Sequence, residues 1–138
     1  MQLEPYIFFH GTCEEALNFY AACLGGKVEG LNRFAGSPME EHAGPQWREK
    51  VMHATLKADG LSFMASDGHP GTPPNGEDNM ALSLAMDDVE RARKIFHALS
   101  EGGTVTIEFS PAFWGGTFGS LTDRFGIQWM VSAGGPHA

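Results

Sequence analysis

An internal repeat constrains the fold of this chain more than any other feature, because one pattern of residues occurs twice in 138 positions. One copy is TCEEALNFYAACLGGKV and the other is DVERARKIFHALSEGGTV. Ala16 and Tyr20 of the first copy correspond to Ala92 and Phe96, 76 positions later, and the paired glycines that follow are 77 positions apart. The sequence therefore predicts two similar modules.

Both copies have the spacing of an amphipathic helix, since their apolar residues recur every three or four positions. Thr12 in the first copy and Asp87 or Asp88 in the second are the expected N-caps, because short polar side chains accept hydrogen bonds from the first helical turn. The glycine pairs at 25–26 and 102–103 are the expected helix ends, where a left-handed residue stops the helix. The apolar positions are Ala16, Leu17, Tyr20 and Leu24 in the first copy, and Ala92, Ile95, Phe96 and Leu99 in the second.

Each predicted helix has a short apolar strand before it and three strands after it, marked by alternation and by β-branched or aromatic residues. The strands before the helices are EPYIFF and MALSLAM. The strands after the first helix are predicted at residues 27–34, 50–57 and 61–66, and those after the second at 104–109, 113–121 and 127–132. Each module is therefore expected to be a βαβββ unit.

The modules are expected to span residues 1–68 and 79–133 of a single domain, 1–138, with a turn-rich linker at 67–78. An insertion at residues 35–47 contains Gly and Pro and could close over a ligand as a lid. One helix can shield only one face of a sheet, so the two open faces are expected to turn toward a shared interior. The expected fold class is α+β, with two curled sheets around a cleft.

Composition excludes several classes of function. The net charge of −8 opposes binding to nucleic acid and to anionic lipid. No apolar run approaches the roughly 20 residues of a membrane span, and MQLEPYIFF lacks the features of a signal peptide, so a cytoplasmic location is expected. Cys13 and Cys23 lie too far apart along the predicted first helix to form a disulfide, and they are expected to be reduced structural thiols.

Four strings occur in order along the chain: PYIFFHGTCEEALNFY, KVMHATL, LSFMASD and FWGGTFGSLTDRFGIQWMV. Together with the repeat they resemble the vicinal oxygen chelate superfamily, which includes glyoxalase I, extradiol dioxygenases, fosfomycin-resistance enzymes and bleomycin-resistance proteins. Within it they look like the PhnB-like branch, often labelled 3-demethylubiquinone methyltransferase-like. The resemblance covers nearly the whole chain, and it implies a homodimer with clefts at or near the subunit interface.

The label of methyltransferase has a chemical requirement that the sequence does not meet. An enzyme that uses S-adenosylmethionine normally has a glycine-rich loop after the first strand of an open parallel sheet. Here the glycines of LGGKVEG follow a predicted helix and are interpreted as a helix stop and a turn. Methyl transfer is therefore not expected.

The resemblance also makes the metal site testable. In metal-dependent members of the superfamily, four inward strand positions supply His, Glu or Gln to a divalent ion, which needs hard or borderline donors. The resemblance places these positions at Tyr6 or Pro5, Met64, Ala81 and Met130. None of these is a good ligand, so no metal is expected.

Two methionines carry this prediction, because Met64 and Met130 occupy matching places in the two modules, four residues after Gly60 and Gly126. One alternative keeps a divalent metal at a non-standard site that uses His53 and Gln128. The histidines otherwise have no metal-binding spacing.

The residues expected to line the cleft combine apolar walls with a few polar groups, as small-molecule sites do. Trp129 is expected in the core, on the opposite strand face from its neighbours Gln128 and Met130. Asp123 and Arg124 are expected to hold the turn before the last strand, with Gly126 in a conformation that a side chain would hinder. The predicted ligand-binding residues are Phe8, His53, Ser62, Met64, Ser83, Trp114, Gln128 and Met130.

Two functions of different class follow. The first is a metal-free small-molecule-binding protein with a resistance or sequestration role, similar to the bleomycin-resistance branch. The second is a glyoxalase- or dioxygenase-like enzyme that uses His53 as acid or base, or a displaced metal. Cys13 is not expected to be a nucleophile, because Glu14 and Glu15 beside it would raise the pKa of its thiol.

Overall fold

The computed structural model describes residues 1–71, 73 and 79–135, which belong to two compact units, Met1–Asn75 and Gly76–Ala138. Each unit has one strand, one long helix and three further strands in that order, so the two predicted βαβββ modules and the α+β class are confirmed. Residues 72 and 74–78 of the predicted linker lie outside the described residues. No helix in the described part of the chain is long and apolar enough to cross a membrane.

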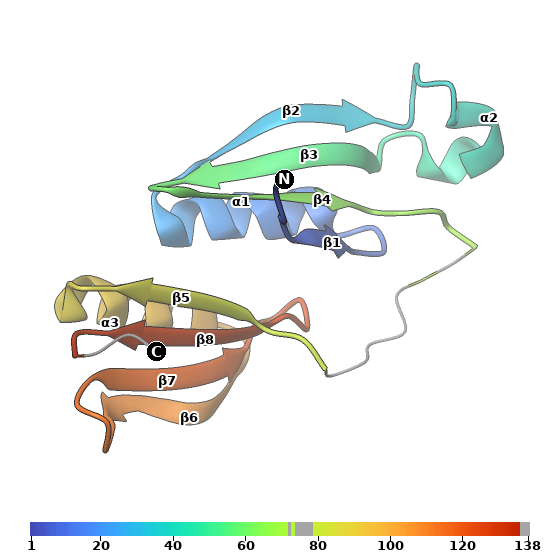
Figure 1. The fold of residues 1–138 in the computed structure, drawn as a ribbon. Helices are drawn as coiled ribbons and strands as arrows, with labels where there is room; N and C mark the ends of the chain where they lie inside the picture. Colours follow the sequence, from blue (N-terminus) through green and yellow to red (C-terminus); the bar gives the residue numbers. More distant parts are fainter. Residues whose placement is uncertain (72, 74–78, 136–138) are drawn as a thin grey trace. The chain divides into compact units, whose positions relative to one another are not determined.

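The first unit is a four-stranded sheet with helix α1 (Cys13–Leu24) along one face (Figure 1). The strands lie in the order β1-β4-β3-β2; β1 is parallel to β4, and the other neighbours are antiparallel. The three strands after α1 lie within one residue of their predicted bounds. The strands are β1 (Tyr6–Phe8), β2 (Lys27–Arg33), β3 (Val51–Ala58) and β4 (Leu61–Ser66).

Helix α1 packs its apolar stripe against this sheet. Leu17 and Tyr20 are fully buried, and the Tyr20 ring centroid lies 6.1 Å from that of Phe63 on β4 and 6.5 Å from that of Phe9. Burying side chains of this size stabilises the fold by roughly 1.5–3 kcal/mol each. Because strand side chains alternate, this packing leaves the opposite face of the sheet without a helix.

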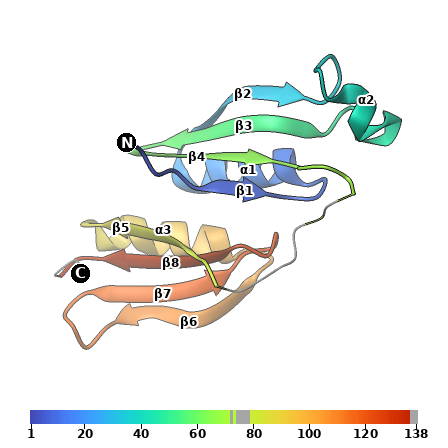
Figure 2. The same ribbon diagram turned by 45° about the vertical axis from the view of Figure 1, so that its right-hand side comes forward.

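The predicted insertion at residues 35–47 is folded against the first unit. It contains the short helix α2 (Glu40–Ala43) and the 3-10 turn η1 (Pro45–Trp47), beyond the ends of β2 and β3 (Figure 2). Trp47 Nε1 donates to the Gly68 carbonyl oxygen at 2.8 Å, and Arg48 Nε pairs with Glu40 Oε1 at 2.8 Å. Closure of this insertion over a ligand stays a prediction.

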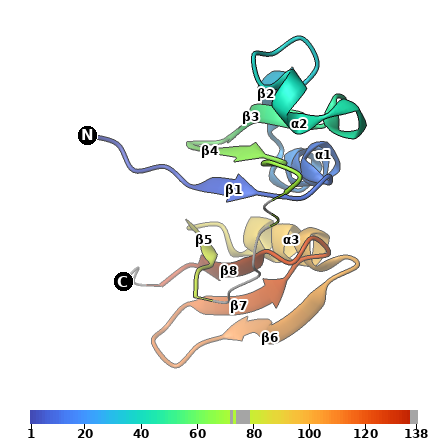
Figure 3. The ribbon, with the colours of Figure 1, turned by 90° about the vertical axis from the view of Figure 1, so that its right-hand side faces the viewer.

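The second unit repeats the arrangement with helix α3 (Val89–Ser100) on one face of its sheet, as Figure 3 shows. The strands lie in the order β5-β8-β7-β6, with β5 parallel to β8. Phe96 of α3 and Trp129, Val131 and Ala133 of β8 are fully buried between helix and sheet. The strands are β5 (Leu82–Met86), β6 (Thr104–Pro111), β7 (Thr117–Thr122) and β8 (Gln128–Ala133).

The predicted strand at 113–121 begins four residues too early. The Ala112 N–H donates to the Gly116 carbonyl at 2.7 Å and the Gly115 N–H to the Ala112 carbonyl at 3.1 Å, so this segment is the turn between β6 and β7. Its aromatic residues, Phe113 and Trp114, have high strand propensity, but the two glycines after them favour a turn. Trp114 therefore lies on a turn rather than on a strand.

The turn before the last strand is held as predicted. Asp123 is buried, and its Oδ1 accepts hydrogen bonds from the N–H groups of Phe125 and Ile127 at 2.8 and 3.0 Å. Arg124 Nε donates to the Glu101 carbonyl at 3.2 Å, which ties the turn to the end of α3. Gly126 has a φ of +88°, which a residue with a side chain rarely adopts.

The helix ends agree with the sequence in part. Gly25 ends α1 in a left-handed conformation with φ +68°, and Asp88 caps α3 by accepting from the Arg91 N–H at 3.0 Å. Helix α3 has an extended residue, Glu101, as its C-cap, and the left-handed Gly102 follows it.

Thr12 lies at the N-cap of α1, but its side chain makes no capping hydrogen bond, so the predicted capping role is wrong. The carboxylate of Asp67 performs it instead. Asp67 Oδ1 accepts from the N–H groups of Gly11 at 2.7 Å and Cys13 at 2.9 Å, and Oδ2 accepts from the Val51 N–H at 2.9 Å. One buried side chain thus joins the start of α1 to the start of β3.

We predict that Asp67→Asn lowers the free energy of unfolding by about 2 kcal/mol or more, because an amide offers one acceptor oxygen where the carboxylate offers two. Urea denaturation followed by circular dichroism measures the change. The control is Asp59→Asn in the exposed β3–β4 turn, expected to change stability by less than about 0.5 kcal/mol. Equal effects of the two substitutions would contradict the assigned role of Asp67.

Candidate functional site

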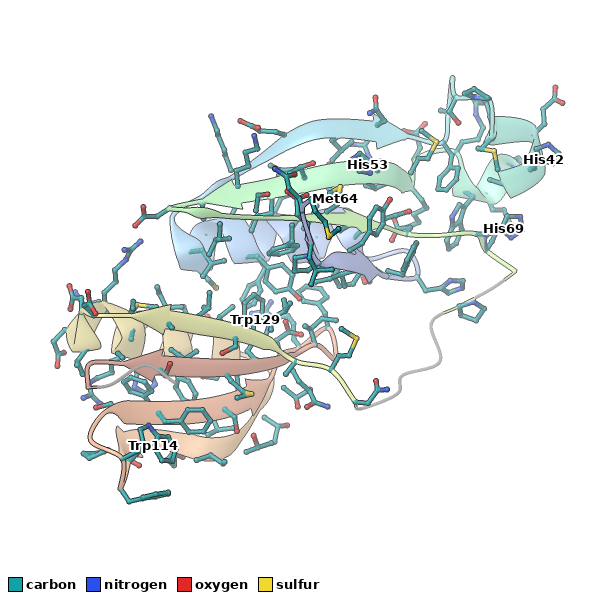
Figure 4. The ribbon with its side chains drawn as sticks, viewed as in Figure 1. His42, His53, Met64, His69, Trp114 and Trp129 are labelled. Atoms are coloured by element: carbon teal, nitrogen blue, oxygen red, sulfur yellow. The ribbon has the colours of Figure 1, made fainter. Side chains whose placement is uncertain are left out.

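The open face of the first sheet holds the four predicted ligand-binding residues of this unit: Phe8 on β1, Ser62 and Met64 on β4, and His53 on β3. Strand pairing places Tyr6 opposite Met64, and Met64 opposite Thr55. Figure 4 shows His53 and Met64 on the neighbouring strands β3 and β4. Phe63 and Ala65, which alternate with Ser62 and Met64 along β4, are buried on the helix side.

Tyr6 and His53 form the most specific contact on this face. Tyr6 Oη and His53 Nδ1 are 3.1 Å apart, and the two ring centroids are 5.8 Å apart. Partial burial raises the pKa of Tyr6, as does nearby Cys13, while a hydrogen bond with Ser66 acts in the opposite direction. The phenol therefore keeps its proton at neutral pH. We predicted His53 as a site residue but missed Tyr6, although its alternation with Phe8 along β1 places both on one face.

The open face of the second sheet is hollowed. A concavity of about 400 Å³ lies over β6, β7 and β8, within the volume range of small-molecule sites. Its lining includes the predicted residues Gln128 and Met130. The described residues that line it are Ala81, Thr106, Ile107, Phe118, Ser120, Leu121, Thr122, Gln128, Trp129 and Met130.

Among the described residues, the lining of this concavity has apolar and polar side chains but no charged one. Phe118, Ile107 and Met130 are apolar, while Thr106 Oγ1 and Ser120 Oγ are linked by a hydrogen bond of 2.6 Å. Register shifts in β6 next to Ile107 interrupt its regular pairing with β7. Such bulges reorient side chains, and they are not recognisable from alternation in the sequence.

Two predicted ligand-binding residues of the second unit, Ser83 and Trp114, do not line the concavity. Ser83 on β5 pairs with Met130 but does not line the concavity. Trp114 lies on the β6–β7 turn (Figure 4), where its ring centroid is 5.6 Å from that of Phe118, which lines the concavity. Trp129 is 1% exposed, and its Nε1 donates to Asp123 Oδ2 at 2.9 Å, so its predicted core position is confirmed.

The strand register corrects one of the family metal positions. Met64 pairs with Tyr6, and Met130 pairs with Ser83, so the second-unit counterpart of Tyr6 is Ser83 and not Ala81. Tyrosine, serine and methionine at these positions are poor ligands for a hard divalent ion. Within the described ranges, no group of three or more His, Cys, Asp or Glu side chains could hold a metal ion. The donors present do not fit the metal of the superfamily.

The alternative metal site would use His53 and Gln128. These residues belong to different units, His53 to the first and Gln128 to the second. His53 Nδ1 already makes a hydrogen bond with Tyr6. Gln128 pairs with Thr122 across β7 and β8.

Three kinds of comparison relate this chain to known proteins. The family model described as 3-demethylubiquinone-9 3-methyltransferase matches residues 1–132. Protein PA1353 from Pseudomonas aeruginosa has a crystal structure that is 40% identical, covers 99% of both chains and has a TM-score of 0.87. Protein YjdN of Escherichia coli is 28% identical over 96% of this chain and 95% of its own length.

Other solved structures are similar in fold. A putative 3-demethylubiquinone-9 3-methyltransferase, PhnB protein, from Bacillus cereus is 24% identical over 96% of this chain and 99% of its own, with a TM-score of 0.80. More distant structures described as glyoxalase/bleomycin resistance proteins, from Albidiferax ferrireducens and Burkholderia phytofirmans, have TM-scores of 0.59 and 0.60 at 20% and 13% identity. At these identities the comparison concerns the fold alone.

The cysteines do not supply a nucleophile. Cys13 is fully buried, and burial, followed by the charges of Asp67 and Glu14, raises the pKa of its thiol to about 12. The predicted rise in the pKa of Cys13 is confirmed, although burial contributes more to it than the neighbouring Glu14 does. Cys13 and Cys23 form no disulfide.

We predict that iodoacetamide at pH 8 leaves Cys13 of the native protein unmodified, because a thiol with this pKa is ionised at a level on the order of 10⁻⁴. Cys23, which is half-buried, is the internal comparison. Mass spectrometry of proteolytic fragments measures the modification, and the protein unfolded in urea should react at both residues. Rapid native modification of Cys13 would contradict the inert role.

Proposed function

We propose, from the premise that the chain belongs to the 3-demethylubiquinone-9 3-methyltransferase family and has the glyoxalase/bleomycin resistance fold, that it is a metal-free small-molecule-binding protein. Its ligand occupies the concavity on the open face of the second sheet. The protein acts as a cytoplasmic homodimer, the assembly that the family resemblance implies. A resistance or sequestration role is consistent with binding of this kind.

The concavity is the observation that supports this function. A site of about 400 Å³ with apolar walls and a few polar groups is typical of small-molecule recognition. Met130 is 38% exposed in it, and a methionine side chain adapts to ligands of irregular shape. Gln128 and the hydroxyl pair of Thr106 and Ser120 supply donors and acceptors that orient a ligand.

The charge of the lining indicates the class of ligand. Because none of the described lining residues has a charged side chain, a charged ligand would lose its hydration there without gaining an ion pair from them. An uncharged molecule with an apolar body and one or two hydrogen-bonding groups fits best.

The family description names a methyl transfer that this proposal does not include. Gly25 ends helix α1, and the only parallel pairs in the described strands are β1 with β4 and β5 with β8. Neither feature provides the strand–glycine loop–helix arrangement that binds a nucleotide cofactor at the edge of a parallel sheet. We therefore propose binding, and not methyl transfer, as the function.

The first test fills the concavity. Ser120→Phe places a ring in the site on a strand that tolerates aromatic residues, and it should abolish the binding of uncharged fragments. Binding is measured through the ¹³C-labelled methyl group of Met130 by NMR, in a screen of uncharged aromatic and aliphatic fragments. Ala85→Phe, on the same face but outside the concavity, is the control. Fragments that bind both variants equally well, or that never perturb Met130, would contradict the proposed site.

A second test separates binding from metal-dependent catalysis. Protein purified without chelator should contain less than about 0.1 equivalent of Mn, Fe, Ni or Zn, and none of these ions should raise its melting temperature, because the donors are poor ligands. Elemental analysis and thermal-shift measurements report the two results. Stoichiometric metal would instead support the enzyme alternative, and His53→Ala would then show whether His53 holds the metal.

A further inference from the structure

The Tyr6–His53 pair on the open face of the first sheet has the properties of a second small-molecule site. We infer that this pair, with Phe8 and Met64 beside it, binds an uncharged planar ring that carries a carbonyl or another hydrogen-bond-accepting oxygen. The inference concerns the first unit alone. It does not depend on a ligand in the concavity of the second unit.

The hydrogen bond between the two side chains determines what the pair offers. Tyr6 Oη lies 3.1 Å from His53 Nδ1, and the phenol, whose pKa is raised, keeps its proton, so we assign Tyr6 as the donor and Nδ1 as the acceptor of this hydrogen bond. A neutral imidazole that accepts at Nδ1 carries its own proton on Nε2. His53 makes no other hydrogen bond within residues 1–71, 73 and 79–135. The Nε2–H group is therefore the donor that a ligand oxygen can accept from.

The rings beside this donor select a planar ligand. Tyr6 and Phe8 are stacked at a centroid distance of 5.0 Å and an interplanar angle of 28°, and Phe8 is 55% exposed. An exposed aromatic ring next to a hydrogen-bonded one provides a surface on which another ring can stack. Met64, which pairs with Tyr6, adds a polarisable thioether that contacts aromatic rings favourably.

The net charge of the chain opposes an anionic ligand on this face. The lysines on neighbouring strands, Lys27 and Lys57, lie 3.0 and 3.5 Å from Glu29 and share its single carboxylate. The net charge of −8 opposes an anionic ligand. A carbonyl oxygen can accept from His53 without carrying a charge to the face.

The experiment uses the full chain labelled with ¹³C at its methionine methyl groups. Met64→Leu and Met130→Leu assign the two reporter signals, one for each unit. Benzamide, a planar ring with a carbonyl, should shift the Met64 signal in a saturable way. Toluene lacks the oxygen and cyclohexanecarboxamide lacks the planar ring, so each should bind at least about fivefold more weakly.

Two conservative variants test the pair itself. Tyr6→Phe and His53→Phe keep an aromatic ring and remove the polar atoms, and each should weaken benzamide binding at least about fivefold. Phe113→Leu, which removes an exposed aromatic ring from the second unit, is the matched control and should leave the Met64 titration unchanged. Circular dichroism checks that each variant is folded. The comparison of benzamide, toluene and cyclohexanecarboxamide uses the unaltered chain, so it holds even if a variant does not fold.

Several outcomes would overturn the inference. Equal affinities of benzamide and toluene, measured from the Met64 signal, would show that the hydrogen bond plays no part in binding. Undiminished binding to Tyr6→Phe and His53→Phe would exclude the pair as the anchor. A shift of Met130 without a shift of Met64 would support the concavity of the second unit and contradict a site on the first.

Discussion

Each four-stranded sheet has one long helix packed on one of its faces. This arrangement determines which side chains form the core and which stay available for ligands. Helix α1 buries one face of the first sheet and α3 buries one face of the second. Strand alternation then sends every second residue to the face that has no helix. The candidate ligand residues lie on these faces because the buried positions are already filled by Phe63 in β4 and Trp129 in β8.

The two open faces have the same topology but different chemistry. The strand pairings make Tyr6 the counterpart of Ser83, and His53 the counterpart of Phe118. The first face thus has an aromatic ring and an imidazole where the second has a small hydroxyl and a phenyl ring. Phenyl in place of imidazole leaves the second face without the nitrogen donors and acceptors of His53. The two units thus share their packing and differ in the side chains of their open faces.

The sequence predicts the parts of this structure that depend on local pattern. The repeat, the helical spacing and the glycine at position 25 are enough to predict both modules, and β4 lies at its predicted bounds. Thr12 failed as the cap of α1 because the acceptor is Asp67, 54 residues beyond Cys13, and no local pattern indicates such a partner. Gln128 and Met130 were predicted to line a ligand site, but the lining from β6 and β7, such as Ile107 and Phe118, was not, because the bulges in β6 depend on pairing with β7. Tyr6 was considered only as a replaced metal ligand.

The methionines at the positions that the family resemblance assigns to metal ligands are best understood together with their strand partners. Met64 lies beside Tyr6, and Met130 lies beside Ser83, so none of these four positions carries a carboxylate, an imidazole or an amide. A thioether instead favours contact with apolar and aromatic groups. The side chains on the open face of the first sheet therefore offer stacking and hydrogen bonding rather than metal coordination, through Tyr6, Phe8 and His53.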